Sequence, residues 1–143
     1  MKLSMTYSVK IKRLNHIFMD TVRLYRQAVS FFMDVCLQEW DTVSSGKLQK
    51  ERVNLVESFT VSSKKNPSVP YDFGANFYKF PSYLRRAAIA EALGKVSSYR
   101  SNLARWEAAD PASRGKEPGL PQAGIIYPAM YRENMFIRTG TYQ

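Results

Sequence analysis

Hydrophobic residues recur at three- and four-residue steps over much of the chain, which is the spacing of helices that bury one face. The first series covers residues 17–40, with apolar side chains at Phe18, Val22, Tyr25, Val29, Phe32 and Cys36, widened by Leu24, Ala28, Phe31 and Val35. A shorter series covers residues 48–59. A third extends from Ile89 to Trp106 in a helix that begins near Pro81, a favourable start signal. The pattern predicts a mainly α-helical fold with three principal helices.

Strand-like alternation is found towards the ends of the chain. Residues 6–14 alternate between apolar and polar positions, which predicts a short strand with one apolar and one basic face. A lone strand leaves its backbone unpaired, so it needs a partner. Residues 135–142 are a second strand candidate. Residues 62–78 and 111–121 are rich in proline and glycine and predict loops, the first of them with aromatic plugs.

The chain is strongly basic. It carries 21 lysines and arginines against 12 aspartates and glutamates, a formal charge of +9. The basic residues extend from Lys2 to Arg138 rather than collecting in one tail, which indicates a charged surface on a folded body. An excess of this size favours a polyanionic partner such as nucleic acid. The alternative is a basic surface that only faces solvent.

Few residues suit catalysis. Cys36, the sole cysteine, falls in a helical apolar series, so we expect a buried thiol, no intrachain disulfide and a reducing compartment. His16, the sole histidine, precedes a predicted helix, where a surface role is usual. Scattered carboxylates and single glycines lead us to expect no metal site, catalytic residue or cofactor. Without a leader-like or membrane-length apolar run, we expect a soluble cytoplasmic protein with no membrane partner.

Contact with nucleic acid is the better supported chemistry, because it needs lysines and arginines on rigid elements, with aromatic neighbours that can stack on unpaired bases. The candidate residues are Lys10, Lys12, Arg13, Arg85, Arg86, Arg100, Arg105, Tyr131 and Arg132. Tyr7, Tyr83 and Tyr99 are further stacking candidates, although an aromatic residue at helical spacing more often belongs to the core. The basic residues of the third helix do not fall on one line, so no single groove-reading face is predicted.

These residues resemble a known family. Phe80-Pro81-Ser82-Tyr83-Leu84-Arg85-Arg86, followed by Ala92-Leu93-Gly94 and Ser97-Ser98-Tyr99, looks like the N-terminal part of transposon-encoded TnpB-type (OrfB) proteins. Tyr127-Pro128, Tyr131 and Asn134-Met135-Phe136 also match, as does an opening strand before a helix rich in phenylalanine and tyrosine. The resemblance covers nearly the whole chain and is most specific over residues 80–99.

The resemblance implies an RNA-guided DNA endonuclease related to type V CRISPR effectors, in which base pairing reads the sequence and the protein reads backbone and shape. It implies a wedge-type β-barrel strand at 1–14, a helical recognition-lobe-like region at 15–110, and a return to the wedge at 111–143. Lys10 and Lys12 would lie on the strand, and the four arginines between Arg85 and Arg105 on a recognition-lobe helix. Guide RNA and target DNA would be the partners, in a prokaryotic cytoplasm.

The chain lacks the RuvC-like domain, with its carboxylate triad and zinc ribbon, that cleaves DNA in that family. We therefore expect an incomplete barrel, a mainly helical fold, and a nucleic-acid-binding part that is not catalytic by itself. One alternative is a helical module whose aromatic stripes form a protein–protein or homo-oligomer interface. A third reading, an enzyme with a hidden site, has little support because titratable groups are few.

Overall fold

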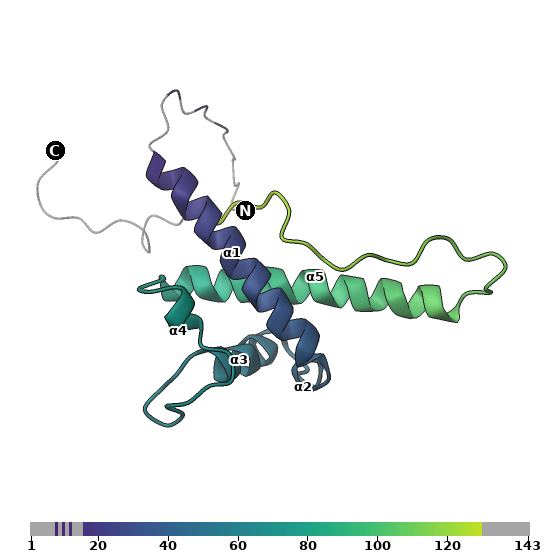
Figure 1. Cartoon of the computed structure of the whole chain (residues 1–143), viewed down its shortest axis with the longest axis horizontal. Helices are drawn as coiled ribbons and strands as arrows, with labels where there is room; N and C mark the ends of the chain where they lie inside the picture. The colour runs from purple at the N-terminus through teal and green to yellow at the C-terminus, as the bar shows by residue number, and fades with distance from the viewer. Residues whose placement is uncertain (1–7, 9, 11, 13–15, 130–143) are drawn as a thin grey trace, which may run out of the picture.

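The computed structural model describes residues 8, 10, 12 and 16–129, and it is mainly helical. The helices are α1 (His16–Gln38), α2 (Trp40–Ser44), α3 (Gln49–Thr60), α4 (Phe73–Asn76) and α5 (Ser82–Ala108). The two long helices, α1 and α5, cross obliquely, and α2, α3 and α4 gather on one side of the crossing (Figure 1). The three helices expected from periodicity are thus confirmed, with α2 and α4 as short additions.

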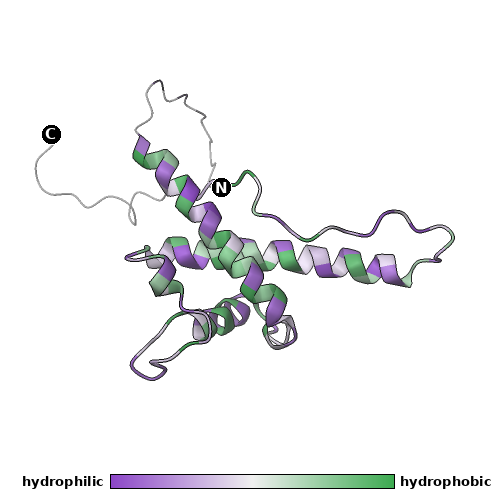
Figure 2. Cartoon of the chain, viewed as in Figure 1, coloured by the Kyte–Doolittle hydropathy of each residue, from purple (hydrophilic) through white to green (hydrophobic). Residues whose placement is uncertain are grey.

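The core lies where α1 crosses α5. Val29 and Phe32 on α1 and Ile89 and Val96 on α5 are fully buried, at the three- to seven-residue spacings of helical faces. Figure 2 shows hydrophobic residues concentrated at this crossing. Burying a side chain of this size stabilises the fold by about 1.5–3 kcal/mol, so the crossing supplies most of the driving force for the long helices. Helix propensity alone would not hold them.

Five phenylalanines join α4 to this crossing. The Phe73 ring stacks on Phe32 of α1 at 4.8 Å between centroids and on Phe77 at 4.5 Å, and it meets Phe80 edge-on at 5.4 Å. The fifth ring, Phe31, contacts both Phe73 and Phe77. Four residues are too few to form a helix alone, so α4 depends on these contacts. It interrupts the predicted loop at 62–78, in which Phe73 and Phe77 pack into the core as expected, whereas Tyr78 is exposed.

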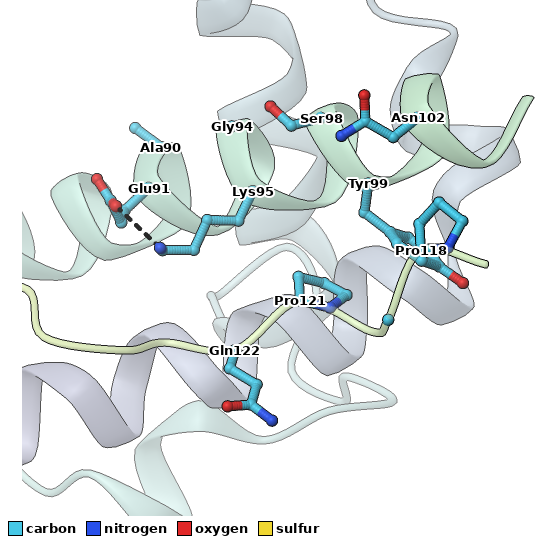
Figure 3. Close-up of a pocket in the computed structure, with 11 residues that line it drawn as sticks. Ala90, Glu91, Gly94, Lys95, Ser98, Tyr99, Asn102, Pro118, Pro121 and Gln122 are labelled. Carbon is cyan, nitrogen blue, oxygen red and sulfur yellow. Dashed lines mark ion pairs between the residues drawn. The ribbon is translucent and has the colours of Figure 1, made fainter. Parts of the chain in front are cut away.

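The chain after α5 runs back beside that helix and is fastened at both ends. The Trp106 indole N–H donates to the Gly115 carbonyl at 2.7 Å, and the Arg114 guanidinium lies 4.1 Å from the Trp106 ring centroid. At the other end, Arg26 Nε on α1 donates to the Ile126 carbonyl at 3.0 Å. Between these points, residues 118–122 and α5 enclose an open groove of about 520 Å³ (Figure 3). We refer to residues 109–129 as the return segment.

The predicted apolar stripes are correct at the crossing and fail away from it. Leu24 was expected to be buried but is 48% exposed, and Phe18 is also exposed. On α5 the stripe is buried up to Val96, whereas Tyr99 and Trp106 are only half-buried. Each long helix extends beyond its partner, so the outer parts of the stripes have no opposing helix among the described residues.

The predicted strands at 6–14 and 135–142 lie mostly outside the described residues. Of the first, only Ser8, Lys10 and Lys12 are described, and all three are exposed. Within residues 16–129, no residue lies in a strand. The helical bundle is therefore the part of the predicted architecture that can be followed in the structure.

Two glycines give opposite expectations for an added methyl group. Gly94 lies exposed inside α5 (Figure 3), and a Cβ there would meet nothing within 4 Å. Gly94→Ala should therefore raise the free energy of unfolding by about 0.5–1 kcal/mol, because alanine is the better helix former. Gly46 is buried, and its Cβ would lie 2.9 Å from Arg52 Cγ. Gly46→Ala should lower the free energy of unfolding by about 1–3 kcal/mol. Urea denaturation measures both; a change of the same sign would contradict the described packing.

Candidate nucleic-acid interface

Two predicted site residues, Arg85 and Arg86, lie in the first turn of α5 and share one carboxylate. Arg85 Nη2 lies 3.2 Å from Glu57 Oε1 on α3, and Arg86 Nη1 donates to Glu57 Oε2. Arg86 also donates to Asn54 Oδ1 at 3.2 Å. The Glu57 and Arg85 side chains are each 20% exposed, and Arg86 is 41% exposed. The cluster ties α5 to α3 and leaves one positive charge uncompensated.

A basic hairpin turn follows α3. Ser63 and Asn66 exchange backbone hydrogen bonds, with N···O distances of 2.8 and 3.1 Å, which places Lys64 and Lys65 at the tip of a two-residue turn. The Asn66 side-chain amide donates to the Ser58 carbonyl at 3.2 Å and holds the turn against the end of α3. Both lysines are exposed. Their ammonium groups are thus offered to solvent from a turn that the protein holds in place.

Lys79 completes this cationic surface. Together with Ser62 and Arg85 it lines a depression of about 240 Å³ between the hairpin base and the start of α5. Residues 57–86 contain five lysines and arginines but only two carboxylates, Glu57 and Asp72. Asp72 Oδ1 accepts the Ala75 N–H at 3.1 Å and caps α4. We call the five cations the basic end: Lys64, Lys65, Lys79, Arg85 and Arg86.

The two other predicted arginines of α5, Arg100 and Arg105, do not join the basic end. Arg100 is half-buried and donates to the Leu37 carbonyl at 3.2 Å, where its charge complements the C-terminal end of α1. Arg105 is exposed but lies 20 residues beyond Arg85, about 30 Å along α5. Lys10 and Lys12 are exposed, whereas the remaining candidates lie outside the described residues: Arg13, Tyr131 and Arg132.

The aromatic candidates divide between half-buried tyrosines of α5 and an exposed tyrosine that sequence analysis did not select. Tyr83 and Tyr99 are half-buried, and burial raises the pKa of the Tyr83 phenol. Tyr7 lies outside the described residues. Tyr78 was not singled out, yet it is 82% exposed and adjoins Lys79 of the basic end. The available signal was its place in a short aromatic run outside any helical period.

The residue types that most often serve in catalysis or metal binding can be located among the described residues. No three histidine, cysteine, aspartate or glutamate side chains among them come together as metal ligands. Cys36 is fully buried, and burial raises the pKa of its thiol to about 12. His16 is exposed at the first position of α1. Of the helices described, none combines the length and apolar character that crossing a bilayer requires.

Comparison with known proteins gives a family match over most of the chain. Residues 5–143 match the model of the Aq_aa04 family. An uncharacterized protein from Aquifex aeolicus (strain VF5), aq_aa04, is 29% identical over 126 residues, covering 80% of this chain and 68% of that protein. No solved structure matches. The family match extends over all five helices and into the segments on either side of them.

Cys36 should resist thiol reagents in the folded protein. A buried thiol with a raised pKa supplies almost no accessible thiolate, so at pH 8 the reaction with Ellman's reagent should be more than about a thousandfold slower than in 6 M guanidinium chloride. Ser30→Cys, at an exposed position of the same helix, is the matched control and should react at once in the native state. Equal rates for the two thiols in native protein would contradict the burial of Cys36.

Proposed function

The chain belongs to the Aq_aa04 family, and we propose that it binds nucleic acid, contacting the phosphate backbone through the basic end. The observation that carries the proposal is the placement of five cations on three adjoining elements. These elements are the hairpin turn after α3, the turn before α5 and the first turn of α5. The two carboxylates of that stretch are both engaged by protein donors. The net positive charge is therefore available to an external polyanion.

The five cations have different roles in this proposal. Arg85 and Arg86 are held by Glu57, so their first role is to fasten α5 to α3. Guanidinium groups carry five donors each, and the more exposed Arg86 has donors left for a phosphate. Reversing the charge of either arginine would remove one of the two partners of Glu57 and place a like charge beside it, which would disturb folding as well as binding. Lys64, Lys65 and Lys79 are therefore the residues that test binding alone.

The resemblance of residues 80–99 to TnpB-type proteins suggests the specific ligand class. Guide RNA and the guide–target heteroduplex are the partners we propose, with the helical bundle in the place of a recognition lobe and residues 6–14 as a wedge-type strand. A protein of that kind needs no base-reading helix, because pairing reads the sequence. The scattered surface cations of α5 agree with backbone contact. We propose that this chain binds without cleaving.

The salt dependence of RNA binding tests the basic end directly. Lys64→Gln combined with Lys65→Gln removes two phosphate contacts, so the slope of log affinity against log salt should fall by about 1.4–1.8. Lys47→Gln combined with Lys50→Gln is the matched control, because both lysines are exposed at the opposite end of α3 and the lost charge is equal. Fluorescence anisotropy with a labelled structured RNA from 50 to 300 mM KCl supplies the measurement.

The control pair should leave the slope almost unchanged. Far-ultraviolet circular dichroism and thermal melting should show that all variants keep the helical fold. Equal slopes for the two double variants would mean that binding is a general property of the positive charge, and the assignment to the basic end would be wrong. No retention of RNA by the unmodified chain at 50 mM KCl would overturn the proposed function itself.

An exposed apolar surface favours a second candidate, a self-association module. Ile17 and Leu24, which lie seven residues apart and therefore share one face of α1, are exposed on its first half, beyond its crossing with α5. Figure 2 shows hydrophobic residues there as well as at the crossing. Apolar side chains exposed together on one helix face are typical of surfaces that pair with another chain. This surface lies on α1, which carries none of the cations of the basic end.

Sedimentation equilibrium decides on this second candidate. A self-associating chain should show a dimer that Leu24→Gln weakens by at least about tenfold, because one buried leucine contributes about 1.5–3 kcal/mol at an interface. Leu120→Gln removes another exposed leucine, which lies in the return segment, and should leave the dimer intact. Weak dimers have dissociation constants of about 10–100 μM. An unmodified chain that is still monomeric at about 100 μM would therefore rule out self-association, whether or not it binds RNA.

A further inference from the structure

Tyr78 lies between Phe77 and Phe80, whose rings pack against the core, while its own ring lies outside the core. It lies in the turn between α4 and α5. In this turn the ring centroids of Phe77 and Phe80 are 5.8 Å apart, and both rings contact Phe73. These rings fix the turn from within. Tyr78 itself is 82% exposed, more than any other large hydrophobic or aromatic side chain of the described residues. The turn therefore presents one open aromatic ring on a firmly anchored base.

The residue after Tyr78 has an unusual backbone. Lys79 has a φ of 54°, in the left-handed region, and it is the sole non-glycine residue with positive φ in the described part of the chain. Glycine adopts this region without strain, whereas lysine does not. Strained backbone of this kind is concentrated at binding sites. Here the lysine ammonium lies over the Tyr78 ring, 5.2 Å from its centroid, so the strained turn places a cation on one face of a ring that is otherwise exposed.

We propose that Tyr78 is a stacking platform for an unpaired nucleotide base, with Lys79 contacting the adjoining phosphate. This inference rests on the proposed function and adds the ligand class: a single-stranded segment of nucleic acid at the basic end. Aromatic stacking accepts any base, because every base has a π-face, and it is denied to a closed duplex whose faces are already stacked. The neighbouring depression, lined by Lys79, Arg85 and Ser62, lies where the backbone of the strand would continue.

Other tyrosines of the described residues do not offer this combination. Tyr83 and Tyr99 are half-buried. Tyr127 is exposed and also has a cation over its ring, the Arg26 guanidinium at 5.1 Å from the centroid, but it belongs to the return segment and not to the basic end. Tyr78 alone among them combines an open ring with a place in the basic end. Tyr127 is therefore the natural control for the loss of an exposed tyrosine.

Tyr78→Ala, Tyr78→Trp and Tyr127→Ala test the inference in the full chain, with three labelled 12-nucleotide probes: single-stranded RNA, single-stranded DNA of the same sequence, and a blunt RNA duplex. Tyr78→Ala should weaken binding of the single strand by about 5- to 150-fold, the range expected for one lost stacking contact, and leave duplex binding within about twofold. Tyr78→Trp should retain single-strand affinity. Tyr127→Ala should change neither.

A loss confined to RNA assigns the platform to a ribose-containing strand, and an equal loss on RNA and DNA assigns it to single strands in general. The inference is overturned if Tyr78→Ala binds the single strands as the unmodified chain does, or if it loses duplex affinity to the same extent. An unmodified chain that binds the duplex but neither single strand also overturns the inference, while leaving the proposed function in place. Failure of the unmodified chain to bind any probe overturns both.

Discussion

The packing of α1 on α5 is the constraint on which the rest of the molecule depends, and the contact of Phe32 with Phe73 extends it to the candidate site. This contact joins the long helix α1 to the four-residue helix α4 at the point where α1 also packs on α5. Through Phe77 and Phe80 the same rings fix the turn that leads into α5. Stacked and edge-on aromatic pairs add about 0.5–1.5 kcal/mol each to the area they bury. The same aromatic rings thus belong to the hydrophobic core and support the turn that carries Tyr78 and Lys79.

The same coupling explains how a basic surface is compatible with a stable fold. Five cations within a short stretch repel one another, and an unrelieved cluster would oppose folding. Glu57 reduces this repulsion, because its carboxylate lies between two guanidinium groups in a site that is only 20% exposed. Screening by salt is weaker at such a partly buried site than on the open surface. The arginines consequently stabilise the bundle while the lysines remain exposed.

The sequence predicted the long elements and missed what depends on distant contacts. Helices α1, α3 and α5 follow from their apolar periods, and the start of α5 follows from Pro81 and Ser82. Helix α4 does not, because its four residues are helical through the rings of Phe31 and Phe32, about 40 positions earlier. The exposure of Leu24 depends on where α1 crosses α5, and a period carries no information about a crossing point.

The candidate site shows the same division. Residue type alone identified Arg85 and Arg86, but their shared partner Glu57 lies 28 and 29 positions away and was not foreseen. The lysines of the hairpin turn and Lys79 were passed over because they fall on loops, where sequence patterns have no period. Tyr78 was missed for a related reason: the sequence places it among phenylalanines, and only the packing shows that they turn inward while it does not.

The hydrogen bond from Arg26 to the Ile126 carbonyl brings the return segment back to α1, the helix with which the bundle begins. Helix α1 starts at His16, so entry to the bundle and exit from it lie within about ten residues of the same helix, or roughly 15 Å. A unit whose two ends are neighbours can be joined into another protein at a single loop without separating the halves of its host. The chain thus enters the bundle through α1 and comes back to α1 after the other helices.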